Sequence, residues 1–332
     1  HRTSSTMLLS LKTFWVVVLH LIVSINAYST LPNVALIIVD DYGHTDIGYH
    51  NKLYDNLLQT PNLDLLAGNG IKLETYYVQP ICTPTRSQLL SGRYQIHTGL
   101  QHGVIHPDEP YGLPTSIPLI TNHLITLGYV CHKVGKWHLG FYTEDHCPWK
   151  RGFGNGPHGG GGSDYGYLGG EEDYYTHVRT PGYDFRDNGV PDHAAATSNE
   201  APNKYSTKLF RERAVAIITN HSRDYSDVPL FLYLPFQAVH SPLQSAPFFQ
   251  KQFDLKKFEN YKERWTYAAM VFEMDFAVGK ILAAFKNASL YDNTVFIVST
   301  DNGGILGGGY NWPFRGEKAT YWEGGSRAVG FV

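Results

Sequence analysis

Residues 34–41 read Val-Ala-Leu-Ile-Ile-Val-Asp-Asp, and they give the strongest indication of the fold class. The part 34–39 is apolar without interruption and rich in β-branched side chains, which is typical of a strand buried on both faces. Such a strand belongs in a parallel sheet that helices cover on both sides. The run ends in two adjacent aspartates, so acidic side chains directly follow the predicted strand.

Three later apolar runs repeat this pattern, and helical patterns separate them. The runs cover residues 129–134, 229–234 and 294–299. Helices are predicted over 60–70, which has a proline in its first turn and a glycine stop, and over 204–220 and 265–287, which have apolar residues at helical spacing. Strands that alternate with helices indicate an α/β fold with a mainly parallel central sheet.

Composition favours a well-buried globular protein. The chain has 332 residues, of which 42% are hydrophobic and 17% are charged, and its formal net charge is -3. These values are unlike those of disordered chains. Because the sequence has no basic run long enough to follow a phosphate backbone, we expect no nucleic-acid partner.

The first 27 residues are interpreted as upstream residues followed by a secretory signal peptide. The predicted signal peptide starts at Met7, after six upstream residues. Lys12 gives it a positive flank, residues 14–25 are apolar, and Ala27 is a small residue suited to cleavage. The apolar run is short for a bilayer span, although a buried N-terminal helix is the alternative. No later stretch is long and apolar enough to span. We therefore expect a secretory-pathway protein, lysosomal or secreted, without a stable membrane anchor.

Cysteines and glycosylation sequons agree with this route. The sequence has 3 cysteines, at positions 82, 131 and 147. A Cys131–Cys147 disulfide is one possibility, and a buried thiol at Cys131 within an apolar run is the other. Sequons begin at Asn220 and Asn287, which predicts a glycoprotein.

Residues 82–93, with the sequence CTPTRSQLLSGR, carry the pattern that points most directly to chemistry. Thr83 is a candidate N-cap and Pro84 suits the first helical position, so a helix is predicted to start here. Cys82 then lies at the positive end of the helix, where backbone N–H groups favour an anion. Arg86 can reach the same place. This arrangement suits an oxyanion held beside a nucleophile, and the alternative is a buried cysteine on an ordinary helix.

Acidic and amide side chains follow two of the predicted strands. Asp40 and Asp41 follow the first strand, and Asp301 and Asn302 follow the last. Ligands of open α/β sheets gather at the carboxyl ends of the strands. An all-oxygen set suits a hard divalent cation such as calcium, which would also relieve the repulsion between the carboxylates. Each pair alone could equally be an ordinary turn.

Basic side chains complete the predicted site. Lys136 and His138 alternate after the second strand, so in extended backbone they would face the same side, where they could steady an anion near Cys82. His240 and Lys318 are candidates for protonating the oxygen of a leaving alcohol. A single loop histidine or lysine is usually only solvated, so the prediction depends on the whole set.

These segments resemble the signature segments of the type I sulfatases. The resemblance rests on Cys82-x-Pro84-x-Arg86 and on residues 60–64, 135–140, 300–304 and 322–325. In that family the cysteine is oxidised to formylglycine, an aldehyde whose hydrate attacks sulfur. The resemblance implies this fate for Cys82, with a formylglycine-generating enzyme as a partner during maturation. It also implies one calcium ion held by Asp40, Asp41, Asp301 and Asn302. The implied catalytic residues are Cys82, Arg86, Lys136, His138, His240 and Lys318.

Within the family, residues 92–102 and 311–316 look most similar to arylsulfatase B, the N-acetylgalactosamine-4-sulfatase. This likeness implies an alkaline-phosphatase-like α/β sandwich that removes sulfate from N-acetylgalactosamine 4-sulfate units of glycosaminoglycans. Because the sequence stops at Val332, where a strand begins, we expect residues 28–332 to be a catalytic domain without the family's small C-terminal domain. The alternatives are a phosphoester or phosphonate hydrolase of the same superfamily and a non-catalytic glycan-binding fragment.

Two segments depart from the family pattern. Residues 152–170 are dense in glycine and are predicted to form a mobile loop, of which 154–162 looks longer than its family counterpart. Residues 106–114 lack the cysteines that arylsulfatase B carries there, so the usual partner of Cys147 is missing.

Overall fold

The computed structural model describes residues 31–51, 57–154, 161–169, 184–192 and 205–332. The predicted signal peptide lies outside these ranges, and so do residues 155–160 of the glycine-rich stretch. Within the described ranges, no helix combines the length and the apolar character that crossing a bilayer requires.

An eight-stranded sheet organises the unit that runs from Asn33 to Val332. Its order is β5-β4-β3-β2-β6-β1-β7-β8. The parallel strands are β1 Asn33–Val39, β2 Val130–Val134, β3 Ser163–Tyr167, β6 Leu230–Pro235 and β7 Thr294–Thr300. The edge strands β4 Phe185–Asp187, β5 Val190–Pro191 and β8 Gly330–Phe331 pair antiparallel to their neighbours. This arrangement confirms the predicted mainly parallel sheet.

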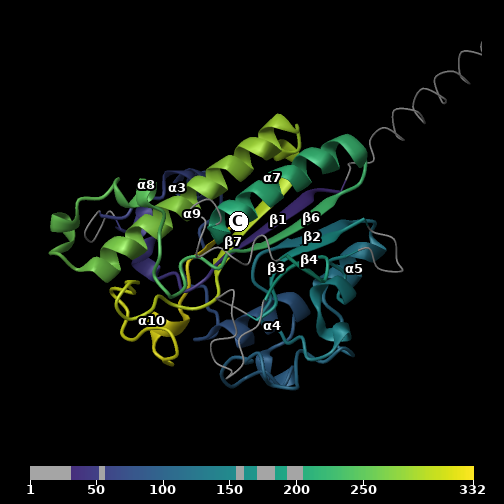
Figure 1. Ribbon diagram of the computed structural model, residues 1–332, viewed down its shortest axis with the longest axis horizontal. Helices are drawn as coiled ribbons and strands as arrows, with labels where there is room; N and C mark the ends of the chain where they lie inside the picture. Colours follow the sequence, from purple (N-terminus) through teal and green to yellow (C-terminus); the bar gives the residue numbers. More distant parts are fainter. Residues whose placement is uncertain (1–30, 52–56, 155–160, 170–183, 193–204) are drawn as a thin grey trace, which may run out of the picture. The chain divides into compact units, whose positions relative to one another are not determined.

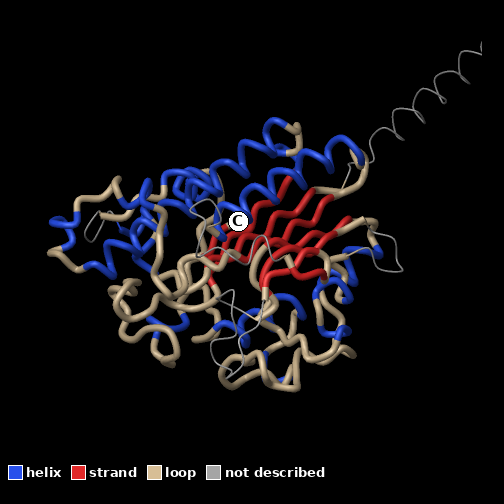
Figure 2. The backbone as a smooth tube through the Cα atoms, viewed as in Figure 1, coloured by secondary structure: helices blue, strands red, loops and turns tan. Residues whose placement is uncertain are grey.

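Helices cover both faces of the sheet (Figures 1 and 2). Alternate residues of β1 enter different cores: Ala35 and Ile37 belong to one, and Leu36 and Ile38 to the other. The first core includes side chains of α3 Pro61–Gly68, α7 Ser206–Asp224 and α9 Lys262–Asn287. The second includes Leu90 of α4 Cys82–Ser91, with side chains of α5 Ile120–Thr126 packed against it. The continuous apolar run of β1 therefore reflects burial on both faces, as predicted.

Short helices fill the connections. The α-helical ones are α2 Gly48–Asn51, α8 Pro247–Gln250 and α10 Glu323–Ser326. The 3₁₀ turns are η1 His44–Asp46, η2 Gln95–His97, η3 Glu144–His146, η4 Pro148–Lys150, η6 Leu255–Phe258 and η7 Tyr291–Asn293.

The interpretation of residues 152–170 as a loop was wrong for part of that stretch, because β3 lies within it and pairs with β2. The glycines permit close backbone contact here. A Cβ at Gly162 would lie 2.1 Å from the Cys131 carbonyl oxygen, and one at Gly166 would lie 2.3 Å from that of Gly135. Glycine density therefore marks where backbones meet.

The possible Cys131–Cys147 disulfide is not present, since both residues are free thiols. Cys131 is 1% exposed and packs in the core that contains Leu90. This agrees with the alternative prediction of a buried thiol. Burial raises the pKa of Cys131 to about 12, so it stays protonated at neutral pH.

Candidate active site

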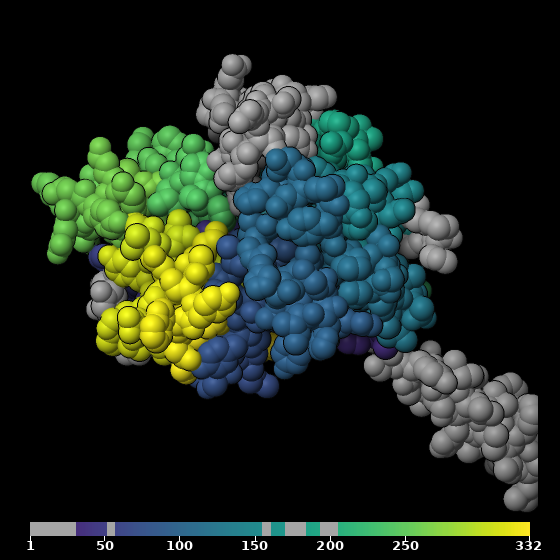
Figure 3. Space-filling view, turned by 90° about the horizontal axis from the view of Figure 1, so that it is seen from below, coloured from purple at the N-terminus to yellow at the C-terminus, as the bar shows by residue number. Residues whose placement is uncertain are grey.

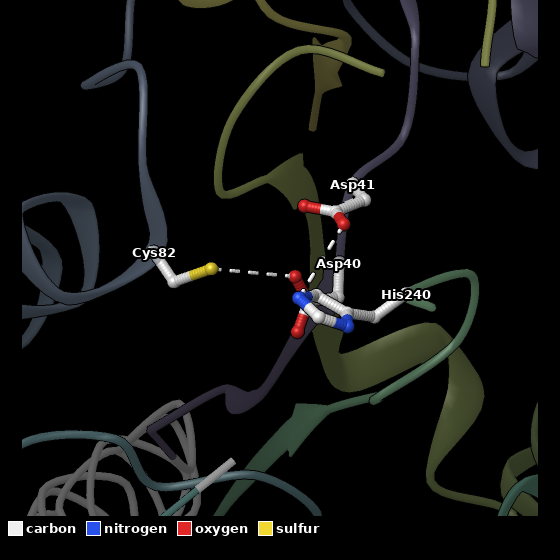
Figure 4. Close-up of side chains that lie close together, drawn as sticks. All are labelled: Asp40, Asp41, Cys82 and His240. Carbon is white, nitrogen blue, oxygen red and sulfur yellow. Dashed lines mark hydrogen bonds and ion pairs between the residues drawn. The ribbon is translucent and has the colours of Figure 1, made fainter. Parts of the chain in front are cut away.

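The carboxyl ends of β1 and β7 bring the four predicted metal ligands together. Asp41 has φ 55°, in the left-handed region. This turn matters because adjacent residues of an extended strand point in opposite directions, whereas here the carboxylates of Asp40 and Asp41 lie close together (Figure 4). The Asp41 amide donates to Asp301 Oδ1 at 3.3 Å, and Asn302 Nδ2 donates to Asp41 Oδ1 at 2.7 Å. The prediction that these two strand ends share one centre is therefore supported by direct contacts.

Cys82 is the first residue of α4, at the positive end of the helix as predicted. The expected N-cap was wrong: Ile81 precedes the helix, and the Thr83 hydroxyl donates instead to the His138 carbonyl oxygen at 2.9 Å. Pro84 is accordingly the third helical residue, where its missing N–H breaks no helical hydrogen bond. The threonine is used to tie α4 to the segment after β2.

The Cys82 thiol lies deep in the site. Its sulfur lies 3.6 Å from Asp40 Oδ1 and 3.4 Å from Asn302 Oδ1 (Figure 4 draws the first contact). Burial, together with the charge of Asp40, raises the pKa of the thiol well above its ordinary range. The unmodified side chain is therefore a protonated thiol and a poor nucleophile.

Arg86 reaches the same cluster as Cys82, where its guanidinium contacts two carboxylates. Its side chain is fully buried, and Nε and Nη2 donate to Asp301 Oδ2 at 3.0 and 2.7 Å. Nη2 also lies 3.3 Å from Asp40 Oδ2. The guanidinium thus ties the carboxylates of the two strand ends to each other and fixes their orientation.

Lys136 connects the nucleophile position to β1. Its ammonium donates to Asp40 Oδ2 at 2.7 Å and lies 3.6 Å from the Cys82 sulfur. Burial would raise the pKa of Asp40, but the charges of Lys136, Arg86 and Lys318 outweigh it and hold the pKa below its ordinary value. Asp40 is therefore an ionised carboxylate despite complete burial.

Lys318 and His240 form the partly open side of the site. Lys318 Nζ lies 2.9 Å from Asp41 Oδ2 and 2.8 Å from His240 Nε2. His240 Nδ1 lies 2.6 Å from the Ser241 carbonyl oxygen, which can only accept, so Nδ1 carries the proton and Nε2 accepts from the lysine. Burial alone would lower the pKa of Lys318, but the carboxylates of Asp41 and Asp40 raise it. The lysine therefore keeps a proton that it can share with the histidine.

The reasoning from extended backbone fails at His138, because its φ is 61°. The residue is buried at 4% exposure, and its amide donates to the Leu168 carbonyl oxygen at 2.9 Å. Its carbonyl accepts from Thr83, the neighbour of Cys82. The backbone of His138 therefore holds the start of α4 in place, independently of the His138 side chain.

The donor set is compatible with a hard cation. Ligand atoms of Asp40, Asp41, Cys82 and His240 all lie within 4.8 Å of one another. Asn302 Oδ1 adds an oxygen next to the same sulfur. Asp40, Asp41 and Asn302 supply the oxygen ligands that calcium or magnesium prefers, whereas Cys82 and His240 supply sulfur and nitrogen, and Asp301 is not a member of the four-residue group.

Among the described residues of the site, three cationic side chains face three anionic ones. The anions are Asp40, Asp41 and Asp301, and the cations are Arg86, Lys136 and Lys318. A bound dication would leave the centre positive, which favours an anionic substrate.

Sequence reasoning missed the residues that support Asp41 from behind the sheet edge. The Tyr267 hydroxyl, from α9, lies 3.0 Å from the Asp41 carbonyl oxygen and 2.8 Å from Asp46 Oδ2. Arg264 donates to Asp46 Oδ1, and Asp46 also accepts from the Tyr310 amide. The only sequence signal was a further aspartate close after the strand end, so the position of Tyr267 could not be anticipated.

Comparison with known proteins gives consistent relationships. The family described as Sulfatase matches residues 32–332. Arylsulfatase J of Mus musculus is 44% identical over 317 residues, 92% of this chain and 48% of that protein. N-acetylgalactosamine-6-sulfatase of Homo sapiens is 31% identical over 310 residues, 89% of this chain and 55% of that protein. The chain thus spans about half the length of the curated relatives it matches.

Solved structures agree in fold. The crystal structure of Ps i-CgsB in complex with k-i-k-neocarrahexaose has a TM-score of 0.79 and 31% sequence identity, covering 91% of this chain and 65% of that one. The predicted family and its α/β fold are confirmed. None of the relatives named here is arylsulfatase B, so the closer likeness to that enzyme stays a prediction.

Proposed function

This chain belongs to the sulfatase family, and on that premise we propose that it hydrolyses sulfate esters of glycans, with Cys82 as the precursor of the nucleophile. One observation carries the proposal. Cys82 lies at a helix N-terminus with its sulfur within 3.6 Å of Asp40, Asn302 and Lys136, which come from three separate segments. In this scheme residues 28–332 form the catalytic domain.

Formylglycine at position 82 would supply a hydrated aldehyde as an oxygen nucleophile. Asp40 Oδ1 is placed to hold a proton of residue 82, and Lys136 would neutralise the negative charge beside it. Lys318 and His240, whose Nζ and Nε2 atoms lie 2.8 Å apart, would deliver a proton to the leaving oxygen. Arg86 keeps the Asp40 and Asp301 carboxylates in place throughout.

A calcium ion held by Asp40, Asp41, Asp301 and Asn302 would supply a positive charge that orients the sulfate oxygens. The oxygen atoms of Asp40, Asp41 and Asn302 support this choice of ion. The test is to measure calcium binding by calorimetry for the parent and for Asp301→Ala. We expect the variant to bind calcium at least tenfold more weakly. Equal affinity in both proteins would remove Asp301 from the ligand set.

We propose N-acetylgalactosamine 4-sulfate units of glycosaminoglycans as the substrate. Support comes from the segments that resemble arylsulfatase B and from the relative that is named an N-acetylgalactosamine-6-sulfatase. Matched 4-sulfated and 6-sulfated N-acetylgalactosamine glycosides test the position of the ester. Faster release of sulfate from the 6-sulfated glycoside would overturn the proposed position of the ester but would agree with N-acetylgalactosamine as the sugar.

The maturation that we propose follows the secretory route to a lysosomal or secreted glycoprotein, with a formylglycine-generating enzyme acting on Cys82. Both sequon asparagines, Asn220 and Asn287, are exposed, as oligosaccharide attachment requires. Mass spectrometry of protein from a eukaryotic secretory host would detect the aldehyde at position 82 and glycans at both asparagines.

Replacement of the nucleophile tests the function. Cys82→Ala should lose sulfate release from an aryl sulfate by at least about 10⁴-fold while keeping its far-UV spectrum and melting temperature. An aryl phosphate and a phosphonate ester assayed in parallel test the alternative hydrolase. A parent protein that carries the aldehyde, binds sulfated glycans and releases no sulfate would instead support the non-catalytic alternative.

A further inference from the structure

A cavity of about 400 Å³ lies directly beside the candidate active site. It is bounded by Gln79–Pro84, by Gln95–Gly103 and by Ala319–Tyr321. Ile81 and Ala319 both line it, and they are the chain neighbours of Cys82 and Lys318. In Figure 3 the C-terminal residues (yellow) lie beside the blue segments that form the other walls. The volume falls within the roughly 300–1,000 Å³ of small-molecule sites.

The cavity has a fixed frame. The Ala319 amide donates to the Pro80 carbonyl oxygen at 2.7 Å, which joins two walls. Gln95 Nε2 donates to Gln79 Oε1 at 2.9 Å, and the Gln79 amide donates to Thr85 Oγ1 at 2.8 Å. These bonds fix Gln79 and Gln95 in the wall of the cavity, so this part of the site is formed before a ligand arrives.

Two wall carboxamides have unmet hydrogen-bonding capacity. The Oε1 atoms of Gln95 and Gln101 are buried and have no hydrogen-bond partner among the described residues. A buried acceptor without a donor costs about 1–3 kcal/mol. The terminal torsion of glutamine is soft, so a small rotation would turn each oxygen toward a hydroxyl or amide N–H in the cavity.

The remaining wall is apolar and aromatic. Pro80, Ile81 and Pro84 line the cavity, and the Tyr321 side chain lies at its edge with 85% exposure. A large aromatic ring left in water beside a polar cavity is the kind of surface on which the C–H face of a sugar ring stacks.

Among the residues that the structure describes, the lining carries no Lys, Arg, Asp or Glu, and His102 is the one ionisable side chain apart from Tyr321. A carboxylate or a second sulfate in this space would therefore lack the cationic partner that its desolvation requires. Neutral hydroxyl and acetamido groups match the carboxamides instead.

We propose that this cavity holds the sugar ring that bears the sulfate ester, and that it selects a neutral pyranose over a uronic acid. The proposal rests on the proposed function, because it assumes that the ester lies between Cys82 and Lys318. It adds a selection rule, with Gln95, Gln101 and Tyr321 as the residues that apply it.

Binding to Cys82→Ala protein tests the rule without turnover. The probes are methyl galactoside 4-sulfate and methyl galacturonoside 4-sulfate, which differ only at C6. We expect calorimetry to give an affinity at least about tenfold higher for the galactoside. Equal affinity, or binding of neither probe, would overturn the proposal. Release of sulfate from an aryl sulfate by the parent tests the proposed function separately.

A charge added to the wall sharpens the test. Gln101→Lys, made in the Cys82→Ala protein, should reduce the galactoside preference by about fivefold or more, because the ammonium supplies the missing partner of the uronate. Tyr94→Lys is the matched control, since Tyr94 is 72% exposed and does not line the cavity, and it should leave the ratio unchanged. A ratio that both variants shift equally would overturn the assignment of this wall.

Removal of the aromatic ring is the second variant. Tyr321→Ala should lower kcat/KM for a sulfated galactoside about tenfold relative to kcat/KM for an aryl sulfate. Tyr94→Ala is its control. An unchanged ratio in Tyr321→Ala would remove the stacking surface from the proposal.

Discussion

Lys133 and Lys136 lie close together on the same segment, and both make buried ion pairs. Lys133 Nζ lies 2.6 Å from Asp164 Oδ1, and Lys136 Nζ lies 2.7 Å from Asp40 Oδ2, with all four side chains at 0% exposure. Lys133 also donates to the Gly135 carbonyl oxygen, whereas Lys136 approaches the sulfur of Cys82. Burial and pairing are therefore the same in a structural pair and in a candidate catalytic one.

The pKa values of the two carboxyls separate the pairs. Burial raises the pKa of Asp164, and the single lysine reduces that effect without reversing it. At Asp40 the effect of burial is reversed, because several cations converge on it. The candidate site at Asp40 thus differs from the isolated ion pair at Asp164 in the number of cations that surround the carboxylate.

The largest expected effect is on turnover. Lys136→Met should lower kcat on an aryl sulfate about 10³-fold, because a positive charge beside residue 82 is lost. Its stability should fall by no more than about 2 kcal/mol, since Arg86 still pairs with Asp40. Steady-state kinetics and urea unfolding of the same preparation measure both. Loss of the fold together with activity would make Lys136 a structural residue like Lys133.

The next effect is on stability alone. Lys133→Met should lower the free energy of unfolding by about 3–5 kcal/mol, because Asp164 is left buried without its cation. Turnover per folded molecule should stay within about twofold of the parent. A hundredfold loss of kcat in a well-folded variant would break the comparison, because it would place Lys133 in the chemistry.

Asp275 shows what happens to a buried carboxylate that is held by N–H donors. It accepts from the Leu63 amide at 2.8 Å and from Asn62 Nδ2 at 2.8 Å at the start of α3. Burial nevertheless raises its pKa to about 6. Because this lies above the ordinary value of about 3.9, the protonated form is favoured in the fold, and stability is lost as pH rises from about 4 to about 6.

Asp275→Asn should remove this pH dependence. Relative to the parent, the variant should gain about 2–3 kcal/mol of stability between pH 4 and pH 7. Urea unfolding at several pH values provides the measurement. A difference between variant and parent that does not change with pH would show that Asp275 keeps its charge when folded.

The smallest expected effect comes from replacing the whole structural pair. Lys133→Met combined with Asp164→Leu should bring the free energy of unfolding back to within about 1 kcal/mol of the parent, because no charge remains buried. A double variant as unstable as Lys133→Met would indicate that the surroundings of Asp164 need a polar group.

Much of the fold could be predicted because continuous apolar runs have few alternatives. The predicted ends of β1, β2, β6 and β7 are correct to within about one residue. The strand β3 was missed because its sequence, Ser-Asp-Tyr-Gly-Tyr, follows a glycine-rich stretch and carries a buried aspartate. The buried aspartate, Asp164, pairs with Lys133 from an earlier strand, and patterns in a single sequence do not reveal such pairs.

The sequence indicated which residues lie together in the candidate site better than it indicated how their side chains are arranged. Strand ends and the pattern around Cys82 identified residues that the fold does bring together. The inward turn of Arg86 toward carboxylates and the left-handed backbone of Asp41 depend on tertiary contacts. Tyr267 was missed for the same reason, since an apolar helical face gives no sign of a hydroxyl directed at a distant carbonyl.

The burial of Cys82 also limits the time during which its side chain is accessible while the chain is being made. Cys82 is 1% exposed, and Asn302, whose Oδ1 lies 3.4 Å from the Cys82 sulfur, is 220 residues later in the chain. At roughly 5–20 residues per second, a ribosome needs about 10 to 45 seconds to make that interval. If Cys82 is converted as we propose, the enzyme has to reach it before β7 docks against β1, and the yield of converted protein would depend on the relative rates of modification and folding.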